Sequence, residues 1–273
     1  MMRNSNMIAD ALFAAPDEIV PAQAPREASR LTRKLEAFLP FDEEERDALD
    51  HIAELNIRHF PAGSILVEPG SSPREIMIMM EGWAIRSKPH DAGRQIVALH
   101  LPGDICDFNA LLTRRADCAI EAASDVRVAC INHRMMSDIT RRFPRIGQAF
   151  WCDSLSAGSV QREWTVNVAT RNARARMSHL LCELHARLFL TGEADADGYD
   201  MPLRQTDLGN ACGLTPETSS RVLARLKADK LVRLKDRRVE IMQAGALLLS
   251  AGYNAQYLHL NQTDEIFRTM FKN

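Results

Sequence analysis

Polar residues able to read the edges of DNA bases gather between positions 205 and 226 of the chain. Arginine can donate two hydrogen bonds to guanine O6 and N7, and glutamate can accept one from the cytosine N4 amino group. These side-chain types share the outer face near the start of one amphipathic segment, which indicates base recognition in the major groove. The candidate DNA contacts are Thr206, Thr215, Glu217, Thr218, Ser220 and Arg221.

A helix, a tight turn and a second helix must hold these side chains in place. Gly209 allows the two helices to cross closely, and Gly213 suits a turn that requires a positive φ. Thr215 can cap the second helix, and Pro216 fits its first position. The basic segment 232–241 follows at once and has the pattern of a β-hairpin. This order predicts a winged helix-turn-helix.

The charge distribution supports a nucleic-acid partner for this part of the chain. The 273 residues include 34 Lys and Arg and 36 Asp and Glu, for a net charge of −2. Residues 1–170 carry 19 basic and 24 acidic side chains, whereas residues 201–243 carry 9 basic and 5 acidic ones. A basic C-terminal module on an acidic body is expected when one domain senses or dimerises and another meets phosphate. The length suggests two domains.

Upstream of residue 132 the pattern changes to short strands. From about Ile57 to Ile131, short apolar runs alternate with turns that contain Gly and Pro, which predicts an antiparallel barrel or sandwich. A capping box at Asp42 and Glu45 predicts a helix before the first strand. Residues 1–28 are rich in Ala and Pro and show no period, so they are predicted to be a flexible tail.

One long helix is predicted after Pro144, because apolar residues recur there at three- and four-residue steps. Its apolar seam needs a partner, and closed twofold dimers are the commonest oligomers, so we expect a homodimer. The alternative is that the seam packs on the barrel of its own chain. A further helix is predicted from Asn172 to Leu190, and the acidic segment 191–202 is predicted to be a loop. The predicted interface residues are Ile146, Phe150, Ala157, Trp164 and Val168.

The cysteines and the apolar segments bear on compartment and on chemistry. No two of the six cysteines lie within four residues of each other, so the chain has neither a CxxC motif nor zinc-finger spacing. Asp10 interrupts the first apolar stretch, and residues 244–263 are too polar for a membrane span. We therefore expect a cytoplasmic protein without a membrane partner. No nucleophile motif, phosphate loop or metal triad is recognisable, so we expect no enzyme.

The order of these parts resembles the Crp/Fnr family of bacterial transcription regulators over about residues 30–245. The resemblance implies an α+β fold with an N-terminal antiparallel β-roll like a cyclic-nucleotide-binding domain, a long dimerisation helix and a C-terminal winged helix-turn-helix. It also implies a homodimer that binds palindromic promoter DNA and contacts RNA polymerase. The expected divisions are a tail at 1–28, the roll at 29–142, the dimerisation helix at 143–171, the DNA-binding domain at 172–245 and an extension at 246–273.

The predicted recognition helix is similar to the Fnr type. Glu217, Ser220 and Arg221 match the pattern of Glu, two residues, Ser and Arg, which implies TTGA-like half-sites in an inverted repeat. Ser219 departs from the family, in which that position is usually apolar.

The expected effector pocket differs from that of the family members that bind cyclic nucleotides. Those members use a Gly-Glu-Leu-Gly/Ala turn and a later Arg-Ser-Ala, whereas this chain has Gly103-Asp104-Ile105-Cys106 and Arg114-Arg115-Ala116. The candidate pocket residues are Asp104, Cys106 and Arg114. The N-terminal cysteine cluster of Fnr is also missing. We therefore expect operator binding without cyclic AMP, iron or another cofactor. Alternative interpretations are control by a cyclic nucleotide, by haem or by thiol oxidation.

Overall fold

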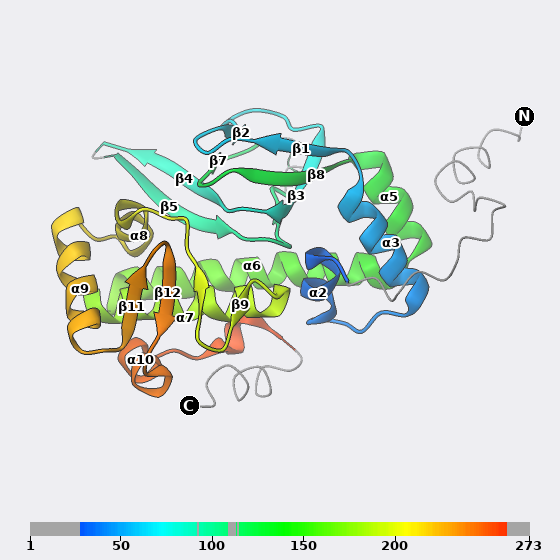
Figure 1. The fold of residues 1–273 in the computed structure, drawn as a ribbon. Coiled ribbons are helices and arrows are strands. Elements are labelled where there is room, and N and C mark those ends of the chain that lie inside the picture. The colour runs from blue at the N-terminus through cyan, green and yellow to red at the C-terminus, as the bar shows by residue number, and fades with distance from the viewer. Residues whose placement is uncertain (1–27, 92, 109–112, 114, 261–273) are drawn as a thin grey trace, which may run out of the picture.

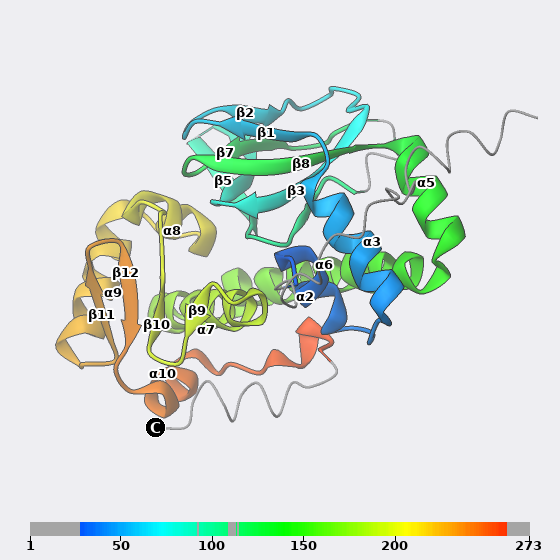
Figure 2. The same cartoon turned by 45° about the vertical axis from the view of Figure 1, so that its right-hand side comes forward.

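The computed structural model describes residues 28–91, 93–108, 113 and 115–260. A β-roll lies over a long helix, and a winged helix-turn-helix lies at one end of that helix (Figures 1 and 2). The predicted α+β class is therefore confirmed. The predicted tail, except for Ala28, and the candidate pocket residue Arg114 lie outside the described residues.

Two four-stranded antiparallel sheets form the roll, with the orders β1-β8-β3-β6 and β2-β7-β4-β5. The central strands of the first sheet are apolar on both faces. In β8, Ala129 and Ile131 face a core shared with helices, whereas Val128 and Cys130 face the second sheet. The strands are β1 (Ile57–Phe60), β2 (Ile65–Val67), β3 (Glu75–Glu81), β4 (Ala84–His90), β5 (Gly93–His100), β6 (Ile105–Cys106), β7 (Ala119–Ala122) and β8 (Val126–Asn132).

Three helices pack on the face of the β1-β8-β3-β6 sheet that points away from the second sheet: α2 (Arg30–Glu36), α3 (Glu43–Glu54) and α5 (His133–Arg142). The predicted capping box begins α3, since the Glu45 amide donates to Asp42 Oδ1 at 2.9 Å and the Asp42 amide donates to Glu45 Oε2 at 3.1 Å. Helix α2, which Ser29 caps and which buries Leu31 and Leu35, was not predicted from the sequence.

The predicted long helix is α6 (Pro144–Thr170), and α7 (Ala173–Thr191) follows it. Asn172 caps α7 as predicted, because its Oδ1 accepts from the Ala175 amide at 3.0 Å. Gly192, with φ 79°, ends the helix in a left-handed conformation. None of the helices in the described ranges combines the length and the apolar character needed to cross a membrane.

The prediction of a loop over residues 191–202 is wrong in part. β9 (Ala194–Asp195) and β10 (Gly198–Asp200) join the wing in a sheet with the order β11-β12-β10-β9. Strands of two and three residues are too short to show a period in the sequence. The remaining elements are α8 (Gln205–Cys212), α9 (Pro216–Ala228), β11 (Val232–Lys235), β12 (Arg238–Ile241), α10 (Ala244–Ala251) and the 3₁₀ helix η1 (Ala255–Leu258).

Candidate nucleic-acid interface

The turn between α8 and α9 is built as the sequence predicts. Gly213 ends α8 with φ 59° and ψ 42°, a conformation that costs glycine least. Thr215 caps α9 by accepting a hydrogen bond from the Thr218 amide at 3.3 Å. Gly209 and Ser219 lie at the crossing, where a Cβ on Gly209 would be 3.3 Å from the Cβ of Ser219. A small residue at 219 therefore fits this chain, although the family usually has an apolar one.

The two faces of α9 differ in polarity. Ser219, Val222, Leu223 and Leu226 are buried against the core. Of the six candidate DNA contacts, Thr206, Thr215, Glu217, Ser220 and Arg221 are exposed, and Thr218 is half-buried. Arg221 donates to the Thr218 hydroxyl at 3.4 Å and forms no ion pair with any described residue. Its guanidinium is therefore available to an outside acceptor.

The wing is the tight β11–β12 hairpin that the sequence predicts. Asp236 and Arg237 form its turn with φ values of 50° and 60°, which matches the right-handed twist of the strands. Arg238 is held by Asp195 at 2.5 Å and Asp200 at 3.4 Å, whereas Arg237 is exposed at the tip. The hairpin thus presents a positive charge beside α9.

The roll contacts the helix-turn-helix through β5. Arg94 bridges Glu121 in the roll and Asp207 in α8, where the Arg94–Asp207 distance is 3.1 Å. Gln95 Nε2 donates to the Asn210 carbonyl in α8 at 2.6 Å. Asp207 is buried and also accepts from the Arg204 amide, so α8 is fixed both within its own domain and against the roll.

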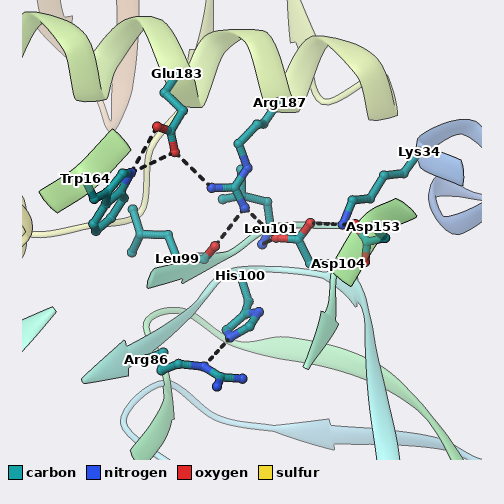
Figure 3. A network of polar contacts seen from close by, with 10 residues as sticks. All are labelled: Lys34, Arg86, Leu99, His100, Leu101, Asp104, Asp153, Trp164, Glu183 and Arg187. Atoms are coloured by element: carbon teal, nitrogen blue, oxygen red, sulfur yellow. Dashed lines mark hydrogen bonds and ion pairs between the residues drawn. The ribbon is translucent and has the colours of Figure 1, made fainter. Parts of the chain in front are cut away.

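Asp104, one of the candidate pocket residues, is the centre of a buried charge network (Figure 3). Its two carboxylate oxygens accept from Lys34 Nζ and Arg187 NH2, each at 2.7 Å. Asp153 lies 2.6 Å from the same Lys34 amine, and Glu183 lies 3.3 Å from Arg187. Burial alone would raise the pKa of Asp104, but Lys34 and Arg187 hold it well below its usual range.

A cavity of about 510 Å³ lies beside this network, between the roll and α6. Asp104 lines it, but Cys106 does not, because its side chain packs between the two sheets. The assignment of Cys106 to the pocket is therefore wrong. Arg86, which was not predicted to line the pocket, lies 3.4 Å from Asp107 and donates to His100 at 3.3 Å. Burial, aided by Arg86, lowers the pKa of His100 to about 3.

The cysteines are free thiols, and most of them are buried. Burial raises the pKa of Cys212 to about 12 and raises the pKa of Cys106 and of Cys182 further. Because the thiolate is the reactive form, these environments disfavour thiol chemistry at neutral pH.

Helix α6 has two apolar faces, and the predicted seam lies mostly on the inner one. Ile146, Phe150 and Trp164 are buried in the core of a single chain, so their assignment to a dimer interface is wrong. Ala157 is exposed and Val168 is half-buried. The outer stripe, which was not predicted from the sequence, consists of Trp151, Leu155 and Val166, which are 72%, 70% and 46% exposed.

A β-roll joined by one long helix to a winged helix-turn-helix defines a DNA-binding transcription regulator with a sensor-type domain. Residues 57–143 match the cyclic nucleotide-binding domain, and residues 175–249 match the Crp-like helix-turn-helix domain. The chain is 26% identical to the transcriptional activator protein FnrL of Cereibacter sphaeroides, over 76% of this chain and 84% of that protein. It is 25% identical to the fumarate and nitrate reduction regulatory protein of Vibrio cholerae, over 80% and 88%.

The fold is also similar to that of FixK2 from Bradyrhizobium japonicum, with a TM-score of 0.65 and 21% identity over 73% of this chain and 98% of that one. The chain belongs to the Crp/Fnr family of transcription regulators.

Proposed function

We propose that the chain is a homodimer that binds TTGA-like half-sites in an inverted repeat within promoter DNA and contacts RNA polymerase there. The observation that carries the proposal is the exposed face of α9, which presents Glu217, Ser220 and Arg221 to solvent. The opposite face of the helix is buried and packs against α8. An exposed arginine with no ion-pair partner among the described residues suits guanine, and the neighbouring glutamate suits cytosine.

The outer stripe of α6 supports the dimer. Trp151 and Leu155 are four residues apart, and Val166 lies further along the same helix. Exposed apolar side chains that share one face of a helix form a patch, and such patches mark interaction surfaces more often than single exposed residues do. A second copy fits best, because the same stripe on two antiparallel or parallel helices can pair with itself around a twofold axis.

The charges around the cavity favour a regulator that needs no cyclic nucleotide. In the described part of the cavity wall, each cation has a carboxylate partner from the chain itself: Lys34, Arg86, Lys88 and Arg187. A phosphate placed there would have to compete with those carboxylates, and burying it without a free cation is costly. Asp104 is likewise occupied and not free to bind a ribose hydroxyl.

Selection of bound sites from random duplex DNA tests the proposal. We expect the purified protein, with no added nucleotide, to enrich an inverted repeat of TTGA-like half-sites about one helical turn apart. Enrichment of a single unpaired half-site would contradict the dimer, and enrichment of no sequence would contradict base recognition by α9.

A further inference from the structure

The chain continues past the wing into a segment that returns to the long helices. After α10, Gly252 turns the backbone, and residues Tyr253–Leu260, here called the clasp, run back along α7 and α6 (Figures 1 and 2). Ala255, Leu258 and Leu260 are buried in the core shared with α6 and the roll. The Ser156 hydroxyl donates to the Leu258 carbonyl at 3.0 Å, and Ser159 lies 2.9 Å from His259 Nε2.

The clasp also binds α7. The Tyr257 hydroxyl donates to Glu183 Oε2 at 2.8 Å, and Glu183 also accepts from the Trp164 indole of α6 at 3.0 Å. The His179 ring of α7 lies against the rings of Tyr253 and Tyr257, with centroid distances of 5.0 and 5.8 Å. One buried carboxylate therefore joins α6, α7 and the clasp.

Residues 171–172 join the two helices covalently, and the clasp contacts both helices at a distance from this turn. α6 ends at Thr170, and α7 begins the DNA-binding domain at Ala173. Because the clasp grips α6 near Ser156 and α7 at Glu183, a change in the angle between these helices must break its hydrogen bonds and expose Leu258. The clasp therefore resists bending at this connection.

We propose that the clasp sets the spacing between half-sites that the regulator accepts. This inference rests on the proposed dimer, in which α6 joins the subunits and α7 carries each recognition helix. The angle between α6 and α7 then fixes the separation of the two copies of α9. A rigid angle penalises repeats whose half-sites are closer together or further apart, because either the DNA or the clasp must deform.

Two truncated chains test this. One ends at Gly252 and lacks the clasp, and the matched control ends at Leu260 and keeps it. Binding is measured on the selected inverted repeat, on repeats with the separation changed by one and two base pairs, and on a single half-site. We expect the parent and the control to lose about tenfold or more in affinity on the altered repeats, a difference of about 1.4 kcal/mol. The chain ending at Gly252 should lose less than about threefold, with unchanged affinity for the single half-site.

Hydrogen exchange without DNA gives an independent readout. Removing the clasp should speed exchange of the α7 amides near Glu183 by about tenfold. Tyr257→Phe should act in the same direction more weakly, and Gln256→Ala, which changes an exposed residue of the same turn, should have no effect. Undiminished spacing discrimination in the shorter chain, or unchanged exchange, would overturn the inference. A parent that binds single and paired half-sites equally would overturn the proposed dimer, and exchange alone would then decide whether the clasp holds the helices.

Discussion

The Asp104 carboxylate is held by cations that the chain supplies from two distant segments, Lys34 in α2 and Arg187 in α7. The roll and the first helix of the DNA-binding domain are thereby tied together by a buried ion pair. Breaking such a pair from one side leaves an uncompensated charge, which is costly. The family resemblance assigns the acid at position 104 to ligand binding, but in this chain its carboxylate is already bound by Lys34 and Arg187.

This arrangement predicts the outcome of calorimetry with cyclic AMP and cyclic GMP. Because the lining cations of the described cavity are already paired, we expect no heat of binding at about 100 µM nucleotide and unchanged operator affinity. Micromolar binding that also tightens operator binding about tenfold would restore the cyclic-nucleotide interpretation.

The sequence predicted the residues of the turn better than those of the pocket. Gly213, Thr215 and Pro216 act through local backbone geometry, so their positions in the sequence are sufficient to assign them. Arg187 lies 83 residues from Asp104 in the chain. No local pattern reveals a partner at that separation, and the missed role of Arg187 follows from this.

Helix α6 shows the same limit at the scale of an element. Its start after Pro144 and its length could be predicted, but periodicity alone does not say which of two apolar faces is buried in its own chain. The inner face meets the roll and α7 through Phe150 and Trp164, which leaves Trp151 and Leu155 outside.

The outer stripe leads to a prediction about assembly. Leu155→Glu would place two like charges face to face in a symmetric interface, while costing the isolated chain little because Leu155 is 70% exposed. Sedimentation should show a monomer, and affinity for the inverted repeat should fall by about a hundredfold or more because the half-sites are no longer linked. Ser137→Glu, an equal charge change at an exposed position of α5, is the control. A Leu155→Glu protein that stays dimeric would show that the stripe is not the interface.

At the scale of the whole molecule, the buried histidines lead us to expect that the free energy of unfolding falls on acidification. Burial lowers the pKa of His179 to about 4 and that of His100 to about 3, from 6.5 in the unfolded chain. At a pH between 6.5 and the folded-state pKa, each of these histidines binds a proton in the unfolded chain but not in the folded one. Its contribution to the free energy of unfolding is therefore complete above pH 6.5 and is lost as the pH falls toward about 4 for His179 and about 3 for His100. Urea unfolding should show a loss of about 2 kcal/mol for each of these two histidines between pH 7 and pH 5, or about 4 kcal/mol together.

Variants separate the histidines in that experiment. His100→Gln should flatten the pH dependence, whereas His59→Gln, at an exposed position, should leave it unchanged. Equal slopes for the parent and His100→Gln would show that His100 does not titrate with folding.

The arrangement of the domains followed from the order of local signals: strands with turn residues, a long helix, and a helix-turn-helix with a basic hairpin. The contacts that fix the domains on each other were not predictable, because Arg94–Asp207 and Tyr257–Glu183 join segments far apart in the chain.

The central claim is that α9 reads DNA through its exposed face, and Arg221→Ala tests it most directly. The variant is titrated against the selected inverted repeat and against the same repeat with its half-site guanine replaced. Arg74→Ala, an exposed arginine on the roll, is the control for loss of charge. We expect Arg221→Ala to lose about 1–3 kcal/mol of binding free energy and most of its preference for guanine, while the control loses neither. Parent-like affinity and an undiminished preference for guanine in Arg221→Ala would contradict the claim.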